Sequence, residues 1–287
     1  MPELPEVEVV KRSLKSLMLN KTIRYFVIKN SKLRYKIDHK QFSNIKNVKV
    51  KSINRKSKYL IISLSNNLCV LIHLGMTGKF FFVKKNDLKK LSFYYNKNDY
   101  IKKHDHLIMV LRNNNKVVYN DVRKFGFIKI IEKNHLFKSK HLKNLGPEPL
   151  TNKFNLGYSL GYFKNRNLNI KNCLMSQSFI SGIGNIYANE ILFKSKIIPT
   201  KAVKELKKHK VKNLIIATKK ILKSSIEKGG SSIQNFKSAN GMEGTFQDNF
   251  KVYNREGLKC SRINCYAIIK KQIIGQRSTF FCPKCQK

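Results

Sequence analysis

The sequence predicts an α+β chain of several domains: an N-terminal helix with an antiparallel β-sandwich, a central helical domain and a cysteine-rich C-terminal hairpin. Three observations predict it. Short β runs follow the first helix, the hydrophobic period becomes helical after residue 145, and four cysteines crowd the last 28 residues. With 287 residues, 41% of them hydrophobic, the chain can fill a core in each part.

The first helix is predicted from apolar residues at helical spacing. Val7, Val10 and Leu14 recur every three or four residues, and charged side chains lie off that stripe. Eight short runs with strand composition follow, which is typical of an antiparallel sandwich. These runs are 22–28, 48–53, 59–64, 68–74, 80–83, 107–111, 117–119 and 127–131.

A helical domain is predicted downstream of the proline-rich turn at 145–150. Helical periodicity covers 173–179, 186–193 and 203–228, and the last run ends at two glycines. The turn at 181–185 is rich in glycine and opens onto a helix N-terminus, where backbone N–H groups can hold a phosphate, although many helix junctions need glycine for geometry alone. Residues 231–250 are polar, as in a loop.

The charge balance favours nucleic acid as a partner. Lys and Arg total 59 against 16 Asp and Glu, a formal net charge of +43, and this is the sign that attracts phosphate backbones. AT-rich codon drift also raises lysine content without selection for binding, so composition alone supports nucleic acid only as a prior. No apolar run of membrane-spanning length occurs, and residues 1–17 carry too many charges for a secretory signal. We therefore expect a cytoplasmic protein that does not interact with membranes.

The C-terminal cysteines predict one structural zinc. Their spacing is Cys260-x4-Cys265-x16-Cys282-x2-Cys285, and four thiolates hold zinc tetrahedrally at about 2.3 Å per sulfur. Paired spacing in a reducing compartment argues for metal rather than disulfides. Cys69 and Cys173 lie in apolar runs and are expected in the core.

Acidic residues are concentrated at the N-terminus. Glu3, Glu6 and Glu8 fall within the first eight residues, and the next acid is Asp38. Acids in a first helical turn interact with the helix dipole and stabilise the helix by about 0.3–1 kcal/mol each, and proline suits the first helical position. Taken alone, this stretch is explained by that structural role.

Several separate motifs, in order across nearly the whole chain, resemble the formamidopyrimidine-DNA glycosylase family. They are Pro2-Glu-Leu-Pro-Glu-Val-Glu8, Lys58-Tyr-Leu60, His73-Leu-Gly-Met-Thr-Gly78, Lys103-His-Asp-His106, Asp121-Val-Arg-Lys-Phe-Gly126, Leu145-Gly-Pro-Glu-Pro-Leu150, Gly182-Ile-Gly-Asn-Ile-Tyr-Ala188 and Gln276-Arg-Ser-Thr-Phe-Phe-Cys-Pro-Lys-Cys285. The resemblance implies a base-excision repair enzyme that removes oxidised purines from duplex DNA and then cuts the backbone by β,δ-elimination. It also implies a central helix-two-turns-helix domain and a zinc finger.

The resemblance assigns the chemistry to the N-terminus. Pro2, exposed by removal of the initiator Met, is the nucleophile, and its secondary amine has an ordinary pKa of roughly 8. Glu3 is the acid that helps open the deoxyribose ring, and Lys58 is the family's active-site lysine. Glu6 occupies a second acidic position that supports the helix turn or the hydrogen bonding of the site. Arg277 on the C-terminal hairpin completes the set of catalytic candidates.

DNA contacts are also implied by matched position. The family fills the gap left by a flipped base with three residues, which match Met76, Arg123 and Phe125. Core packing is the alternative role for Met76 and Phe125. Phosphate contacts match His104, Arg166, Asn185 and Arg277. His104 and His106 also form a candidate metal pair, although no third ligand occurs nearby. Ser238–Thr245 is where a cap over the flipped base is expected.

The sequence departs from the family pattern in three places. The first cysteine pair is separated by four residues where the family usually has two, Val122 replaces a proline, and Lys124 replaces an arginine. The first departure questions the geometry of the zinc knuckle. The resemblance places domain ranges at 1–134, 146–238 and 251–287 and implies a monomeric enzyme of the bacterial cytoplasm, used at the nucleoid.

Two other functions compete with this interpretation. The pyrimidine-lesion relative, endonuclease VIII, tends to show Gly-Pro where this chain has Leu4-Pro5. A non-catalytic DNA-binding protein predicts loss of Pro2, Glu3 or Lys58, and all three are present.

Overall fold

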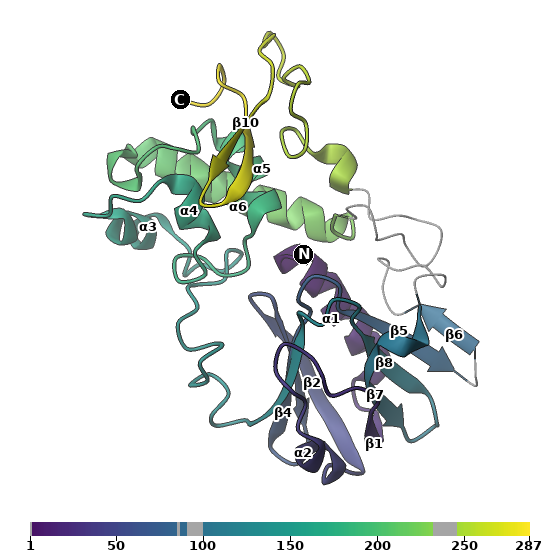
Figure 1. Cartoon of the computed structure of the whole chain (residues 1–287). Coiled ribbons are helices and arrows are strands. Elements are labelled where there is room, and N and C mark those ends of the chain that lie inside the picture. Colours follow the sequence, from purple (N-terminus) through teal and green to yellow (C-terminus); the bar gives the residue numbers. More distant parts are fainter. Residues whose placement is uncertain (1, 85–86, 91–99, 232–245) are drawn as a thin grey trace. The chain divides into compact units, whose positions relative to one another are not determined.

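The computed structural model describes residues 2–84, 87–90, 100–231 and 246–287 (Figure 1). The chain divides into two compact units, residues 1–143 with 228–245, and residues 144–227 with 246–287. No helix of the described residues is long and apolar enough to cross a membrane. The predicted α+β class with a sheet-containing N-terminal part and a helical part is confirmed.

The first unit opens with α1 (Leu4–Met18), which forms as predicted. Glu3 and Glu6 make a capping box at its start, and a proline occupies its first turn. Val7, Leu14 and Met18 are completely buried against the sheet. Each such side chain contributes roughly 1.5–3 kcal/mol of hydrophobic stabilisation. A short helix, α2 (His39–Ser43), follows the first strand.

Among the described residues of this unit, nine antiparallel strands make up the sheet, in the order β6-β5-β8-β7-β1-β2-β3-β4-β9. Their bounds are β1 (Thr22–Ile28), β2 (Val48–Lys56), β3 (Tyr59–Leu64), β4 (Leu68–His73), β5 (Lys79–Lys84), β6 (Asp87–Lys90), β7 (Asp105–Leu111), β8 (Lys116–Asn120) and β9 (Phe127–Glu132). Only two residue pairs join β1 to β2, so the strands form two halves linked at this point. One hydrophobic core takes side chains from both halves and from α1, which is sandwich packing.

All eight predicted strands are present, with ends that differ by up to three residues. The strand β6 was not predicted, because Asp87–Lys90 is too polar to show a strand pattern. A short 3-10 turn, η2 (Lys102–His104), precedes β7.

The second unit contains four helices among its described residues: α3 (Leu156–Phe163), α4 (Ile170–Met175), α5 (Asn185–Ser195) and α6 (Lys208–Glu227). The helix α3 was not predicted because two glycines interrupt its pattern, and the side chain of Asn155 caps it by accepting from Tyr158 N. The helix predicted at 173–179 is observed as α4, which begins three residues earlier, at Ile170. It begins there because the side chain of Asn169 accepts from Asn172 N and caps the helix.

The helix predicted at 203–228 is interrupted at its start. Val203–Glu205 forms a 3-10 turn, η3, and α6 begins at Lys208. Leu206 N donates to Val203 O, three residues back, which closes a 3-10 turn, and the next helical turn starts separately, where Lys210 N and Val211 N donate to Lys207 O. Another 3-10 turn, η4 (Phe246–Asn249), leads to the hairpin β10 (Lys270–Ile274) and β11 (Arg277–Phe281). The predicted domain limits stay a prediction.

Candidate active site and nucleic-acid interface

The acidic residues at the start of α1 are buried and hydrogen-bonded. Glu3 is 2% exposed and Glu6 is 7% exposed. Glu6 Oε2 accepts from Glu3 N at 2.8 Å, while Oε1 accepts from the N–H and the hydroxyl of Ser231 at 2.9 and 3.0 Å. Pro2, directly before this pair, is also buried. The Glu6 carboxylate therefore holds the segment next to Pro2 in one conformation and ties it to Ser231.

Lys58 lies in the turn between β2 and β3, and an arginine ties this turn to α1. Arg55 donates from Nε to Glu8 Oε2 at 3.0 Å and from Nη1 to Ser57 O at 2.8 Å. Burial raises the pKa of Glu8, but hydrogen bonds and charges from Lys11 and Arg55 outweigh burial and lower it. Glu8 is thus an ionised anchor, and the turn bearing Lys58 is attached to the helix that begins beside Pro2 and Glu3.

The positive charge of Lys58 affects the pKa of His73. Burial first, then the positive charges of Lys58 and Arg34, lower the pKa of His73 to about 4. Its Nδ1 accepts from Gly75 N at 3.1 Å, which also requires an unprotonated nitrogen. His73 is therefore a neutral imidazole at neutral pH.

The three residues matched to the base-flipping wedge lie on two turns of the first unit. Met76 follows β4 and is half-buried, while Arg123 and Phe125 follow β8 and are exposed. The Arg123 guanidinium stacks 4.7 Å from the ring centre of Phe125. Phe125 is 47% exposed, so core packing does not explain it.

The two substitutions next to these residues fall in the same exposed turn. Val122 is 47% exposed, and Lys124 is exposed with a φ of 59°. Because neither side chain is buried, the departures from the family pattern leave the core of this unit unchanged.

The metal pair considered for His104 and His106 is not formed. His106 is completely buried, and its two ring nitrogens lie 2.9 Å from Asn30 O and 3.0 Å from Asp121 O. Neither nitrogen is available to a metal. In the part of the chain that the structure describes, the cysteine quartet is the one cluster of three or more potential metal ligands. His104 is half-buried in the turn before β7.

In the second unit, Asn185 is the first residue of α5, after the glycine-rich turn. Its Nδ2 donates to Ser278 O at 3.0 Å, so it bonds to the strand that begins with Arg277. Arg277 is exposed and follows a tight turn in which Gly275 and Gln276 both have positive φ. The structure thus brings two of the predicted phosphate-binding residues into one small region.

Arg166 is exposed after α3, and its guanidinium stacks 4.2 Å from the ring centre of Tyr162. Its predicted phosphate contact stays a prediction.

A residue that the sequence reasoning missed is Lys171. It is completely buried, and its ammonium donates to Asn185 Oδ1 at 2.7 Å and to Thr279 Oγ1 at 3.0 Å. A lysine inside the apolar stripe of Ile170 and Leu174 is the only signal for it. In a chain with 59 Lys and Arg, that signal could not be separated from solvated charge.

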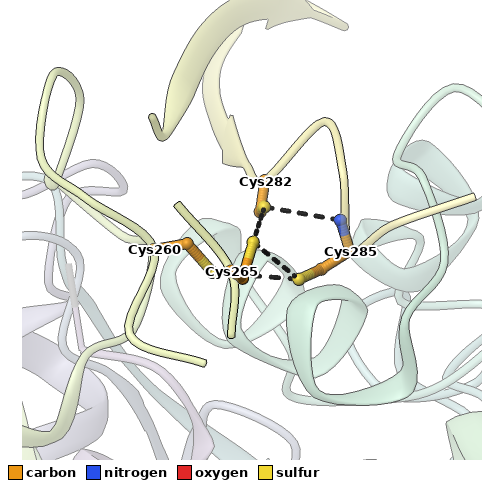
Figure 2. Close-up of side chains that lie close together, drawn as sticks. All are labelled: Cys260, Cys265, Cys282 and Cys285. Carbon is orange, nitrogen blue, oxygen red and sulfur yellow. Dashed lines mark hydrogen bonds between the residues drawn. The ribbon is translucent and has the colours of Figure 1, made fainter. Parts of the chain in front are cut away.

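The four C-terminal cysteines meet at one point, as Figure 2 shows. Their sulfur atoms all lie within 4.8 Å of one another, with Cys265 Sγ 3.6 Å from Cys282 Sγ and 3.3 Å from Cys285 Sγ. A tetrahedron of sulfurs at about 2.3 Å from zinc has edges of roughly 3.8 Å, so this quartet fits one zinc ion. The four-residue spacing of the first pair therefore still closes the ligand set.

The residues inserted in the first cysteine pair include Arg262, which contacts α5. Its Nη2 donates to Phe193 O, and its guanidinium lies 4.5 Å from the centre of the Phe193 ring. The knuckle is thereby attached to the C-terminal end of that helix.

Comparison with known proteins decides the family. Family models match three parts of the chain: the formamidopyrimidine-DNA glycosylase N-terminal domain at residues 1–128, the formamidopyrimidine-DNA glycosylase H2TH domain at 145–237, and the zinc finger found in FPG and IleRS at 257–287. A formamidopyrimidine-DNA glycosylase of Rickettsia bellii is 38% identical over 287 residues and covers all of both chains. The chain belongs to the formamidopyrimidine-DNA glycosylase family.

Other family members agree along the full length. The formamidopyrimidine-DNA glycosylase of Roseobacter denitrificans is 36% identical over all of both chains. Among solved structures, the Lactococcus lactis Fpg in a complex with abasic-site DNA matches with a TM-score of 0.86 and 30% identity over 99% of each chain. A mutant of the Lactococcus lactis protein, in a complex with Fapy-dG DNA, matches with a TM-score of 0.87 and 31% identity over 100% of each chain.

Two further sequence expectations have different outcomes. Cys69 and Cys173 are buried core residues, as predicted. The cap expected at Ser238–Thr245 lies outside the described residues.

Proposed function

We infer that this chain is a bifunctional DNA glycosylase and abasic-site lyase of base-excision repair. It removes oxidised purines, such as 8-oxoguanine and formamidopyrimidines, from duplex DNA and then cuts the strand at the abasic site. The observation that carries this conclusion is the start of α1, where Pro2 and Glu3 precede a helix whose first turn is held by Glu6. This arrangement occurs in a chain that aligns with a family member from end to end.

Pro2 is the nucleophile in this proposal. Once Met1 has been removed, its secondary amine attacks C1′ of the damaged nucleotide, so that a bond from C1′ to Pro2 N forms and the C1′–N bond to the base breaks. The proton of the amine passes to the departing base, which leaves a neutral nitrogen on C1′. Glu3 gives a proton to the ring oxygen as the C1′–O4′ bond opens, which leaves an iminium ion. Loss of a C2′ proton expels the 3′ phosphate, and a second elimination expels the 5′ phosphate. Water then releases the sugar fragment and restores Pro2.

Lys58 and Glu6 support that chemistry in different ways. Lys58 is 7% exposed, and its turn is tied to α1 through Arg55 and Glu8. Glu6 carries no reacting proton in this proposal, because both of its oxygens accept hydrogen bonds from Glu3 and Ser231. Arg277 assists by holding a phosphate of the reacting nucleotide.

Double-stranded DNA is the partner of this monomeric enzyme. Met76, Arg123 and Phe125 fill the space left by the flipped base, and His104, Arg166, Asn185 and Arg277 bind phosphates. One structural zinc on the cysteine quartet holds the hairpin that carries Arg277. The enzyme works in the bacterial cytoplasm, at the nucleoid; its DNA substrate and the pairing of its cysteines for zinc and not for disulfides support this proposal. The catalytic domain spans 1–134, the helix-two-turns-helix domain 146–238, and the zinc finger 251–287.

Borohydride trapping tests this function. Wild type, a variant that retains Met1, and Lys58→Met are each incubated with a duplex that holds one 8-oxoguanine opposite cytosine. Borohydride reduces the iminium to a stable amine, so we expect a covalent complex with wild type, none with retained Met1, and a strongly reduced amount with Lys58→Met. Trapping only on a thymine glycol duplex would assign the chain to pyrimidine lesions, and binding without trapping on any duplex would contradict an enzymatic role.

A further inference from the structure

Asp121 is a buried carboxylate at the end of β8 whose hydrogen bonds reach two turns. It is completely buried. Oδ1 accepts from the Thr77 hydroxyl at 2.5 Å, and Oδ2 accepts from Gly126 N at 2.8 Å and from the Tyr119 hydroxyl at 3.4 Å. The two oxygens therefore bind Thr77, which directly follows Met76, and Gly126, which directly follows Phe125.

The Thr77 hydroxyl extends this link to Arg123. Its single hydrogen goes to Asp121, and its oxygen accepts from Arg123 N at 3.0 Å. A hydroxyl can do both at once, because it carries one donor and two acceptor lone pairs. The turn that carries Met76 is thus bonded directly to the backbone of Arg123.

The backbone of Asp121 fixes a third segment. Its N–H donates to His104 O at 3.0 Å, and its carbonyl lies 3.0 Å from Nε2 of the buried His106. One residue therefore contacts the turn of Met76, the turn of Arg123 and Phe125, and the backbone of His104.

Glycines let the two turns approach closely. A Cβ on Gly75, whose φ is +62°, would overlap the backbone of Phe125 and Gly126, and a Cβ on Gly126 would overlap the Tyr119 hydroxyl. Close packing of this kind leaves little room for the turns to move independently.

We propose that Asp121 and Thr77 are positioning residues that hold Met76, Arg123 and Phe125 as one rigid wedge for base flipping. This inference rests on the proposed function. Extruding a base costs a few kcal/mol of unstacking and unpairing, and the inserted side chains offset this cost only if they are already held in place. The carboxylate, with three donors inside one domain, provides that constraint without touching DNA.

The test separates wedge insertion from chemistry. Thr77→Val removes both hydroxyl bonds at nearly constant volume, and Thr77→Ser restores them. Three rates are measured at saturating enzyme: excision of 8-oxoguanine from a duplex, the fluorescence rise of a 2-aminopurine next to the lesion, and cleavage of an abasic site in a single strand. The last reaction needs Pro2 chemistry but no base flipping.

We expect Thr77→Val to slow both duplex rates about tenfold, a size in the range for loss of a hydrogen bond to a charged group, and to leave single-strand cleavage within about twofold. Thr77→Ser returns the duplex rates to within about threefold of wild type. Thr218→Val is the matched control, because it removes a buried hydroxyl whose bond, to Leu214 O at 2.8 Å, stays inside α6.

Two results would overturn the inference: duplex rates of Thr77→Val within about threefold of wild type, or an equal loss in all three assays. If Thr77→Val does not fold, Asp121→Asn replaces it and must slow the same two rates selectively. Wild type that performs neither excision nor abasic cleavage overturns the proposed function, and this inference with it. If wild type cleaves abasic single strands and Thr77→Val has the same duplex rates as wild type, the wedge inference alone is refuted.

Discussion

The buried ammonium of Lys171 donates to the side-chain oxygen of Asn185 at 2.7 Å, and it also donates to Thr279 at 3.0 Å. This lysine joins the first residue of α5 to the strand β11, which begins with Arg277. Asn185 in turn donates to Ser278 O. The side chain of Asn185 is therefore oriented on both of its polar atoms before DNA binds.

Replacing Lys171 with Met should weaken DNA binding, because Asn185 loses the donor that orients it. We expect the Kd for a duplex with a tetrahydrofuran abasic analogue to rise about tenfold, measured by fluorescence anisotropy. Lys201→Met removes the same charge from an exposed ion pair with Glu205 and is the control for general electrostatics. Equal losses for the two variants would mean that Lys171 acts through its charge alone.

Glu190 should be essential for the stability of the second unit. Its carboxylate is buried and accepts from the N–H groups of Lys251, Val252 and Tyr253. Oε1 accepts from all three N–H groups, and Oε2 accepts from Lys251 N alone. Glu190→Gln therefore sets an amide NH2 against Lys251 N and makes the remaining acceptor weaker, which should lower the free energy of unfolding by about 2–3 kcal/mol. Thermal unfolding and hydrogen exchange at these three amides measure the loss. Glu205→Gln on the surface should change neither, and unaltered exchange in Glu190→Gln would refute the role.

The lowered pKa of His73 predicts a pH dependence of stability. The ordinary pKa of 6.5 falls to about 4 in the folded chain, first because of burial and then because of positive charge from Lys58. The unfolded chain therefore binds a proton to this ring below pH 6.5 while the folded chain does not, so stability falls from pH 6.5 towards pH 4. Urea unfolding across this range should show a shallower decline for His73→Asn. An NMR titration midpoint of His73 above about pH 6.5 would contradict the sign.

The zinc prediction concerns stoichiometry and DNA binding together. Purified protein should contain one zinc per chain, and Cys282→Ser should lose the metal and most of the affinity for duplex DNA, because the hairpin with Arg277 loses its anchor. Elemental analysis and anisotropy measure the two effects. Cys69→Ser, in the core of the other unit, should keep its zinc. Zinc retained in Cys282→Ser would exclude this ligand set.

Arg262 should slow zinc loss through its contact with Phe193. Arg262→Leu removes the hydrogen bond to the end of α5, and we expect zinc release to a chelator to become about threefold to tenfold faster. The release is followed with a colorimetric zinc indicator. Lys259→Leu removes a neighbouring exposed charge and should release zinc at the wild-type rate. Identical rates for Arg262→Leu would show that the inserted residues do not brace the knuckle.

The local sequence pattern predicted the helices and strands of this protein well where the hydrophobic period agrees with the residues that typically start or end such elements. The stripe of Val7, Val10 and Leu14 predicted α1, and alternating apolar runs predicted eight strands. The helix α3 was missed because glycines weaken the helical pattern. The turn η3 was not separated from α6 because a 3-10 turn and an α-helix place apolar residues at nearly the same spacing, so hydrophobic period alone does not distinguish them.

The sequence by itself determined the family, the set of cysteines and the identity of the candidate nucleophile, because each depends on residue type and spacing. The tertiary structure decided which polar groups meet: Glu8 with Arg55, Thr77 with Asp121, and Lys171 with Asn185 and Thr279. Strand register and helix packing set these contacts, and they bring together residues up to 108 positions apart. A buried polar group is stable only when a partner is present, so these pairings follow from the packed core and not from any motif.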